Sequence, residues 1–150
     1  MKVKYLFAFI IALFPLIINA QNYDNLWMEF NKNIDNRLPK SANEVLDIIE
    51  KQAVKDKNDV QLLKVIINRC DVISMTSETP SDSIISYCKA KLPELSAASQ
   101  VILQVEIAKA NRTHSHDVSE ELIESQYVTA IEKAKELGNH SMSYLMFSLS

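Results

Sequence analysis

Glycine is almost absent from this 150-residue chain, in which Gly138 is the only one. All-β folds need many tight turns, and those turns favour residues that adopt positive φ, glycine first among them. We therefore expect an all-α fold whose helices are joined by short connections. The same scarcity excludes glycine-rich phosphate loops and dinucleotide-binding fingerprints.

The first 20 residues have the organisation of a secretory signal peptide. Lys2 and Lys4 form a short basic start, residues 5–18 are almost wholly apolar, and Ala20 is a small residue before a cleavage point at Gln21. The apolar run is shorter than the roughly 20 residues of a comfortable membrane span, so an uncleaved anchor is the less favoured alternative. We expect export to the periplasm or the exterior, with the membrane involved only during export.

Residues 21–150 are expected to form one small domain, because roughly 130 residues is the length of a single domain. Without Lys2 and Lys4 it carries 14 basic and 19 acidic residues, a net charge of about −5. No basic patch lies on any predicted helix face, so nucleic-acid binding is not expected.

Apolar residues recur at spacings of three and four, which is typical of amphipathic helices. The pattern predicts helices over residues 23–35, 39–54, 60–74, 80–92, 94–110 and 118–137, and a further helix from residue 141. The expected inward residues of the first, fifth and sixth helices are Tyr23, Leu26, Trp27, Phe30 and Ile34; Leu95, Ala98, Ile102, Val105 and Ala108; and Leu122, Ile123, Tyr127, Ala130, Ile131, Ala134 and Leu137.

Punctuating residues mark the ends of these helices. Proline at a first helical position, capping side chains and a C-terminal glycine are the usual signals. The predicted signals are Pro39 and Pro80 as first residues, Asn58 or Asp59 and Thr79 as caps, Ser41–Glu44 and Asp117–Glu120 as capping boxes, and Gly138-Asn139 as a stop.

Residues 51–58 and 132–139 resemble each other weakly at an offset of 81 residues, about two helical-hairpin units. We therefore expect antiparallel hairpins stacked as a short α-solenoid of the tetratricopeptide kind. Stacked helix pairs need a capping or continuing neighbour. Because residues 144–149 are largely apolar and uncapped, the chain is interpreted as a fragment of a longer protein or a truncated gene product.

The only local group of candidate metal ligands is His114, His116 and Asp117. A catalytic zinc needs three protein ligands and an open position. Asp117 would have to serve as the third ligand, yet the following helix needs it as a cap. An exposed polar loop is the favoured interpretation, and neither a metal, a cofactor nor a catalytic residue is expected.

Cys70 and Cys88 allow a disulfide, because the chain carries an export signal. Both also lie on apolar helix faces, where a free cysteine behaves as a small hydrophobic residue. The sequence leaves both alternatives open.

Glu120, Glu121 and Glu124 are expected to form a solvated first helical turn.

Several short sequence segments near the start of the mature region resemble those of a known family. They are Tyr23-Asp-x-Leu-Trp27, Leu38-Pro-Lys-Ser-Ala42, Glu44-Val-Leu-Asp47, and Gln61-Leu-Leu-Lys64 with Arg69. Over about fifty residues the chain resembles the mature N-terminal region of large alpha-2-macroglobulin-like proteins of Bacteroidetes-type bacteria. The resemblance implies an exported protein that traps proteases or guards the periplasm. The family's Cys-Gly-Glu-Gln thioester and β-sandwich domains do not occur here, so no functional residue is carried over.

The leading hypothesis is a non-catalytic, exported helical scaffold that forms the N-terminal part of a truncated alpha-2-macroglobulin-like protein. Its expected partners are proteins, including the remainder of a longer chain. The alternative is a periplasmic tetratricopeptide-like binding module of a signalling protein. A third hypothesis is a metal-dependent activity that uses His114 and His116.

Overall fold

The structure is a computed structural model that describes residues 22–114 and 119–138. Their regular structure is entirely helical, which confirms the all-α prediction. The predicted signal peptide and the helix predicted from residue 141 lie outside the described residues. The described part of the chain divides into two compact units, with the boundary between Val45 and Leu46.

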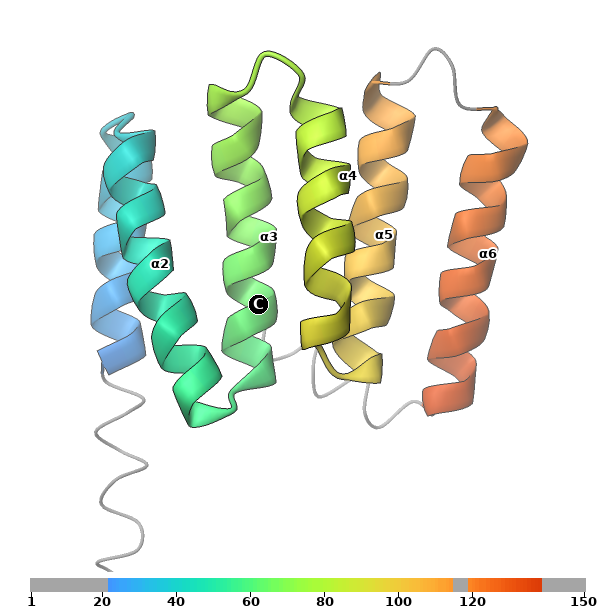
Figure 1. Ribbon diagram of the computed structural model, residues 1–150, viewed down its shortest axis with the longest axis horizontal. Helices are drawn as coiled ribbons and strands as arrows, with labels where there is room; N and C mark the ends of the chain where they lie inside the picture. Colours follow the sequence, from blue (N-terminus) through green and yellow to red (C-terminus); the bar gives the residue numbers. More distant parts are fainter. Residues whose placement is uncertain (1–21, 115–118, 139–150) are drawn as a thin grey trace, which may run out of the picture. The chain divides into compact units, whose positions relative to one another are not determined.

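Helices follow one another along the described chain with short connections (Figure 1). One helix covers residues 22–35. The others are α2 (Pro39–Asp56), α3 (Asp59–Thr76), α4 (Pro80–Lys91), the 3₁₀ turn η1 (Leu92–Glu94), α5 (Ala97–His114) and α6 (Glu120–Leu137). Helices α3, α4, α5 and α6 run in alternating directions, and each contacts the next. Helix α3 also contacts α5.

Two residues just beyond helix ends adopt the left-handed conformation although neither is glycine. Arg37 has φ of 57° and Lys57 has φ of 52°. The Leu38 amide donates to the Asn33 carbonyl at 2.8 Å, and the Asn58 amide donates to the Ala53 carbonyl at 2.9 Å. These bonds are typical of the Schellman motif. Gly138, with φ of 78°, ends α6 as predicted.

The predicted helix starts are partly confirmed. Pro39 and Pro80 are first helical residues, and the Asn58 side chain caps α3 by accepting from the Gln61 amide at 3.1 Å. The Ser41 capping box is wrong, because Ser41 lies inside the first turn of α2. Thr79 occupies the cap position of α4, but its side chain makes no capping bond.

The predicted boundaries of the last two described helices need correction. Glu94 belongs to η1, so α5 begins three residues later than predicted and continues to His114. Asn111 is therefore a buried helical residue rather than the start of a loop, and its amide donates to the Gln126 side chain at 3.0 Å. Ser119, not Asp117, caps α6 by accepting from the Leu122 amide.

In the first unit, the aromatic stripe is buried as predicted. Tyr23, Trp27 and Phe30 are 4%, 8% and 3% exposed. The rings of Trp27 and Phe30 pack edge to face, with centroids 5.6 Å apart. Such pairs add to the stabilisation that comes from burial alone.

In the second unit, one apolar core joins the end of α2 to α3, α4 and α5. Its buried members are Ala53, Leu62, Leu63, Ile66, Cys70, Cys88, Leu95, Leu103 and Ile107. The predicted stripe of α5 misses Leu103 and Ile107, because α5 is buried on more than one side. The predicted stripe of α6 is wrong at Leu122 and Ile131, which are about half exposed. No helix in the described part of the chain is long and apolar enough to cross a membrane.

Candidate functional site

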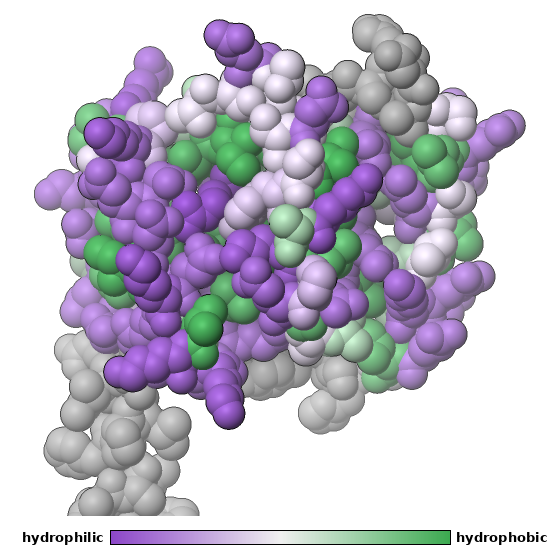
Figure 2. All heavy atoms as spheres, viewed as in Figure 1, coloured by the Kyte–Doolittle hydropathy of each residue, from purple (hydrophilic) through white to green (hydrophobic). Residues whose placement is uncertain are grey.

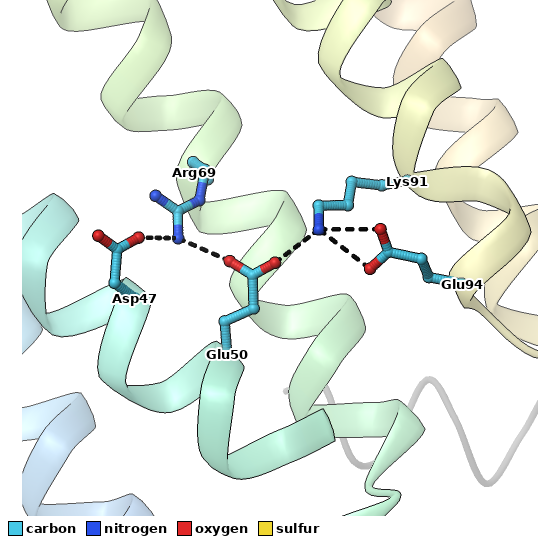
Figure 3. Close-up of polar contacts among 5 residues, drawn as sticks. All are labelled: Asp47, Glu50, Arg69, Lys91 and Glu94. Carbon is cyan, nitrogen blue, oxygen red and sulfur yellow. Dashed lines mark hydrogen bonds and ion pairs between the residues drawn. The ribbon is translucent and has the colours of Figure 1, made fainter. Parts of the chain in front are cut away.

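Five charged side chains form a chain of alternating sign across three helices and η1 (Figure 3). Arg69 of α3 lies between Asp47 and Glu50 of α2, which are three residues apart and so share one helix face. The Arg69 Nη2 atom donates to Asp47 Oδ1 at 2.8 Å and to Glu50 Oε2 at 2.9 Å. The Arg69 side chain is only 11% exposed, so these carboxylates replace its lost hydration.

Glu50 connects the two halves of this ion cluster. Its other oxygen, Oε1, accepts from Lys91 Nζ at 2.7 Å. Lys91 ends α4, and its ammonium also donates to both Glu94 oxygens of η1 at 3.0 Å. The cluster of Asp47, Glu50, Arg69, Lys91 and Glu94 therefore ties α2 to α3 and to the end of α4.

The surroundings favour the charged forms of both bases. Burial lowers the pKa of Arg69, but Tyr87, Asp47 and Glu50 raise it more, so the net shift is upward. Burial likewise lowers the pKa of Lys91, and its hydrogen bonds to Glu50 and Glu94 more than compensate. Burial raises the pKa of Tyr87 despite the nearby Arg69 cation. The charged forms of Arg69 and Lys91 keep their ion pairs with the neighbouring carboxylates near neutral pH.

Two shallow hollows adjoin the ion cluster. One is lined by Asp47, Glu50, Lys51, Val54, Lys91 and Glu94. The other is lined by Ala53, Val54, Lys57, Asn58, Asp59, Leu62 and Glu94. Val54 borders both hollows and is 57% exposed. The combination of an exposed apolar side chain and a charged rim is typical of a surface that contacts another protein.

Asp59 joins the starts of α3 and α5. Its Oδ1 atom accepts from the Ser96 amide at 2.8 Å, and its Oδ2 atom accepts from the Ser96 hydroxyl at 2.6 Å and from the Ser99 hydroxyl. Asp59 is predicted as an alternative cap for α3, but its main role is at the neighbouring helix. The hydrogen bonds between Asp59 and Ser96 join residues 37 positions apart in the sequence, so no local sequence pattern predicts them.

The two cysteines are neighbours in the core. Their Sγ atoms lie 3.4 Å apart, and Cys70 also donates to the Ile66 carbonyl at 3.3 Å. Cys70 is 8% exposed and Cys88 is fully buried. Both are free thiols in this structure. The hydrogen bond with Cys88, together with burial, raises the pKa of Cys70.

The candidate metal ligands are not brought together by any described contact. His114 is the last residue of α5, while His116 and Asp117 lie outside the described residues. Among the residues that the structure describes, no group of three or more His, Cys, Asp or Glu side chains could hold a metal ion. Glu120 and Glu121 lie in the first turn of α6, and Glu124 is exposed in the next.

The surface offers no large apolar patch on the face shown in Figure 2, where polar residues predominate and apolar ones form small separate groups. Exposed apolar side chains are distributed over several helices and include Ile48, Val54, Met75, Leu122, Val128 and Ile131.

No protein-family model, curated protein or solved structure matches the chain.

Proposed function

We propose that this protein is a non-catalytic helical scaffold that is exported from the cytoplasm and contacts other protein segments. The observation that carries the proposal is the ion cluster of Asp47, Glu50, Arg69, Lys91 and Glu94. Each of its two bases pairs with two carboxylates, and these ion pairs connect helices. Charged groups used in this way stabilise an arrangement of helices and do not perform proton transfer or nucleophilic attack.

The packing of α3 to α6 supports a solenoid of stacked hairpins as the architecture. Each helix contacts its neighbour in sequence, and α3 also contacts α5, the next helix but one. In stacked helical hairpins, each unit buries its apolar face against the adjacent unit, which yields a continuous core. Such arrays present extended surfaces to partners, and the hollows beside Val54 are one described surface that suits a contact.

The proposed family is the alpha-2-macroglobulin-like family, of which this chain would supply the helical N-terminal module. Two of the sequence segments that carry the resemblance contain Asp47 and Arg69. In the ion cluster, Arg69 Nη2 lies 2.8 Å from Asp47 Oδ1. Tyr23 and Trp27 of another such segment are core residues. The segments that carry the resemblance therefore contain residues that hold the helices together. This supports a common architecture and does not assign inhibitory activity.

The sequence encoded downstream of Ser150 tests the family proposal. β-Sandwich domains in the same reading frame are the expected result, because the family's protease-trapping parts are built from them. Further helices followed by a membrane span would favour the tetratricopeptide-like module of a signalling protein. A stop codon directly after Ser150 would contradict membership in a longer chain.

Export is tested by expressing the full chain in a Gram-negative host and fractionating the cells. We expect a periplasmic product whose N-terminal residue is Gln21. The matched control replaces Leu13 in the apolar run with arginine, which should leave the full-length precursor in the cytoplasm. A wild-type protein that keeps Met1 and stays in the cytoplasm would contradict the proposal.

A further inference from the structure

The Cys70 and Cys88 side chains lie together in the core shared by α3 and α4. Their sulfur atoms are 3.4 Å apart, and the residues are separated by 18 positions in the chain. Leu63, Ile66 and Leu103, which are fully buried, belong to the same core cluster. Because the chain contains only two cysteines, each has a single intramolecular partner.

We propose that Cys70 and Cys88 form an intramolecular disulfide that cross-links α3 to α4 when the protein folds in an oxidising compartment. The oxidant is an external disulfide, carried by a small thiol compound or by a thiol–disulfide oxidoreductase. A thiolate of one cysteine attacks this disulfide, forms a mixed disulfide and releases one thiol. The second cysteine displaces the other external thiol, so the external disulfide gains two electrons and the two thiol protons.

The positions of the two sulfurs favour this bond. A disulfide needs sulfur atoms about 2.05 Å apart. The present separation of 3.4 Å must therefore shorten by rotation of the side chains and a small approach of the helices. The apolar surroundings suit a disulfide, which has no donor to satisfy, whereas the Cys70 thiol must find the Ile66 carbonyl as an acceptor.

Burial determines when the bond forms. Cys88 is fully buried and Cys70 is 8% exposed, so an external disulfide cannot reach either sulfur in the folded domain. The hydrogen bond between the two thiols raises the pKa of Cys70, with burial acting in the same direction, and it lowers the pKa of Cys88, so the shielding by neighbouring side chains is what prevents exchange in the folded domain. The exchange therefore takes place during folding or in a transiently opened state. Once formed, the disulfide is shielded from reductants by the same side chains.

The test refolds the full chain from a reduced, unfolded state in a buffer of oxidised and reduced glutathione. The proposal rests on the proposed export only for the source of the oxidant, and this buffer supplies it independently. We expect a monomer that is lighter than the reduced chain by about 2 Da, with no thiol left to alkylate after denaturation. We also expect a strong reductant to lower the melting temperature by roughly 10 °C, because it reopens the closed loop.

The matched controls are Cys70→Ala and Cys88→Ala, each of which leaves one cysteine without a partner. Neither variant should show the loss of mass, and its melting temperature should not respond to the reductant. The wild-type mass measurement does not depend on whether these variants fold. Two alkylatable thiols in the refolded wild type, or a product dominated by glutathione adducts or disulfide-linked dimers, would overturn the proposal.

Discussion

At the scale of single residues, Lys57 occupies a backbone conformation that suits glycine. Its φ of 52° lies in the left-handed region, where a residue other than glycine has a steric cost of about 1 kcal/mol. We predict that Lys57→Gly raises the free energy of unfolding by about 0.5 kcal/mol, since part of the relief is offset by the greater freedom of glycine in the unfolded chain. Urea denaturation followed by circular dichroism measures the change.

The matched control for this prediction is Lys55→Gly, which removes the same charge from a helical position two residues earlier. That substitution should lower the free energy of unfolding by about 1 kcal/mol, because glycine disfavours a helix interior. Equal destabilisation by both variants would contradict the left-handed geometry at Lys57. In the weak similarity between residues 51–58 and 132–139, Lys57 aligns with Gly138, whose φ is also positive.

At the scale of helices, Asp59 stabilises the start of α5 from the neighbouring α3. It accepts hydrogen bonds from Ser96 and Ser99, which provide the donors at the beginning of α5. We predict that Asp59→Ala lowers the free energy of unfolding by about 1–2 kcal/mol, the usual cost of losing a helix cap. Amide hydrogen exchange should show the greatest loss of protection in the first turn of α5.

Asp82→Ala provides the comparison, because Asp82 is an exposed acid in the first turn of α4. An acid in that place contributes only through the helix dipole, so its loss should cost about 0.3–0.5 kcal/mol. If the two variants lose the same stability, Asp59 does not act as a cap for α5.

The ion cluster gives the stability an alkaline limit. Hydrogen bonds to Glu50 and Glu94 raise the pKa of Lys91 above its usual value of 10.5, despite the opposite effect of burial. The stabilisation is therefore fully present below pH 10.5 and is lost as the pH rises through the folded-state pKa. We predict that Lys91→Met costs about 1 kcal/mol at pH 7 and that its deficit against the wild type shrinks above pH 10.5.

The control for this pH dependence is Lys89→Met, which alters an exposed lysine of the same helix. Its stability should follow that of the wild type at every pH, because no carboxylate contact of Lys89 is lost. A constant deficit of the Lys91 variant across the alkaline range would show that packing, not charge, is responsible. The burial that raises the pKa of Tyr87 is common to all three proteins, so the comparison between variants removes its effect.

The helix ends were predictable from sequence in part, and the contacts between helices were not predictable. Pro39, Asn58 and Gly138 act through their own backbone or the next turn, so local sequence suffices to identify them. The Schellman motifs at Arg37 and Lys57 lack glycine and carry no such signal. Arg69 meets Asp47 across 22 residues, a separation that depends on how α2 and α3 pack.

At the scale of the whole molecule, burial is uneven within the unit of residues 46–150. The shared core draws its buried residues from α2, α3, α4, α5 and the η1–α5 connection. In α6, by contrast, Ala130 is the one fully buried residue among those that the structure describes, while Val128 and Ile131 are about half exposed. A single apolar stripe could not be assigned from sequence to α5, because more than one side of this helix is buried.

This uneven burial predicts a gradient of local stability. Because local opening costs least where few apolar contacts are lost, amides of α6 should exchange through openings of lower free energy than those of α3 and α5. Leu103 is fully buried, so Leu103→Ala should cost about 2–5 kcal/mol and lower the protection of α3 and α5 together. The exposed Ile131→Ala should change neither helix. Equal protection of α6 and α3 in the wild type would mean that α6 opens only with the shared core, and the unit would then be uniformly cooperative.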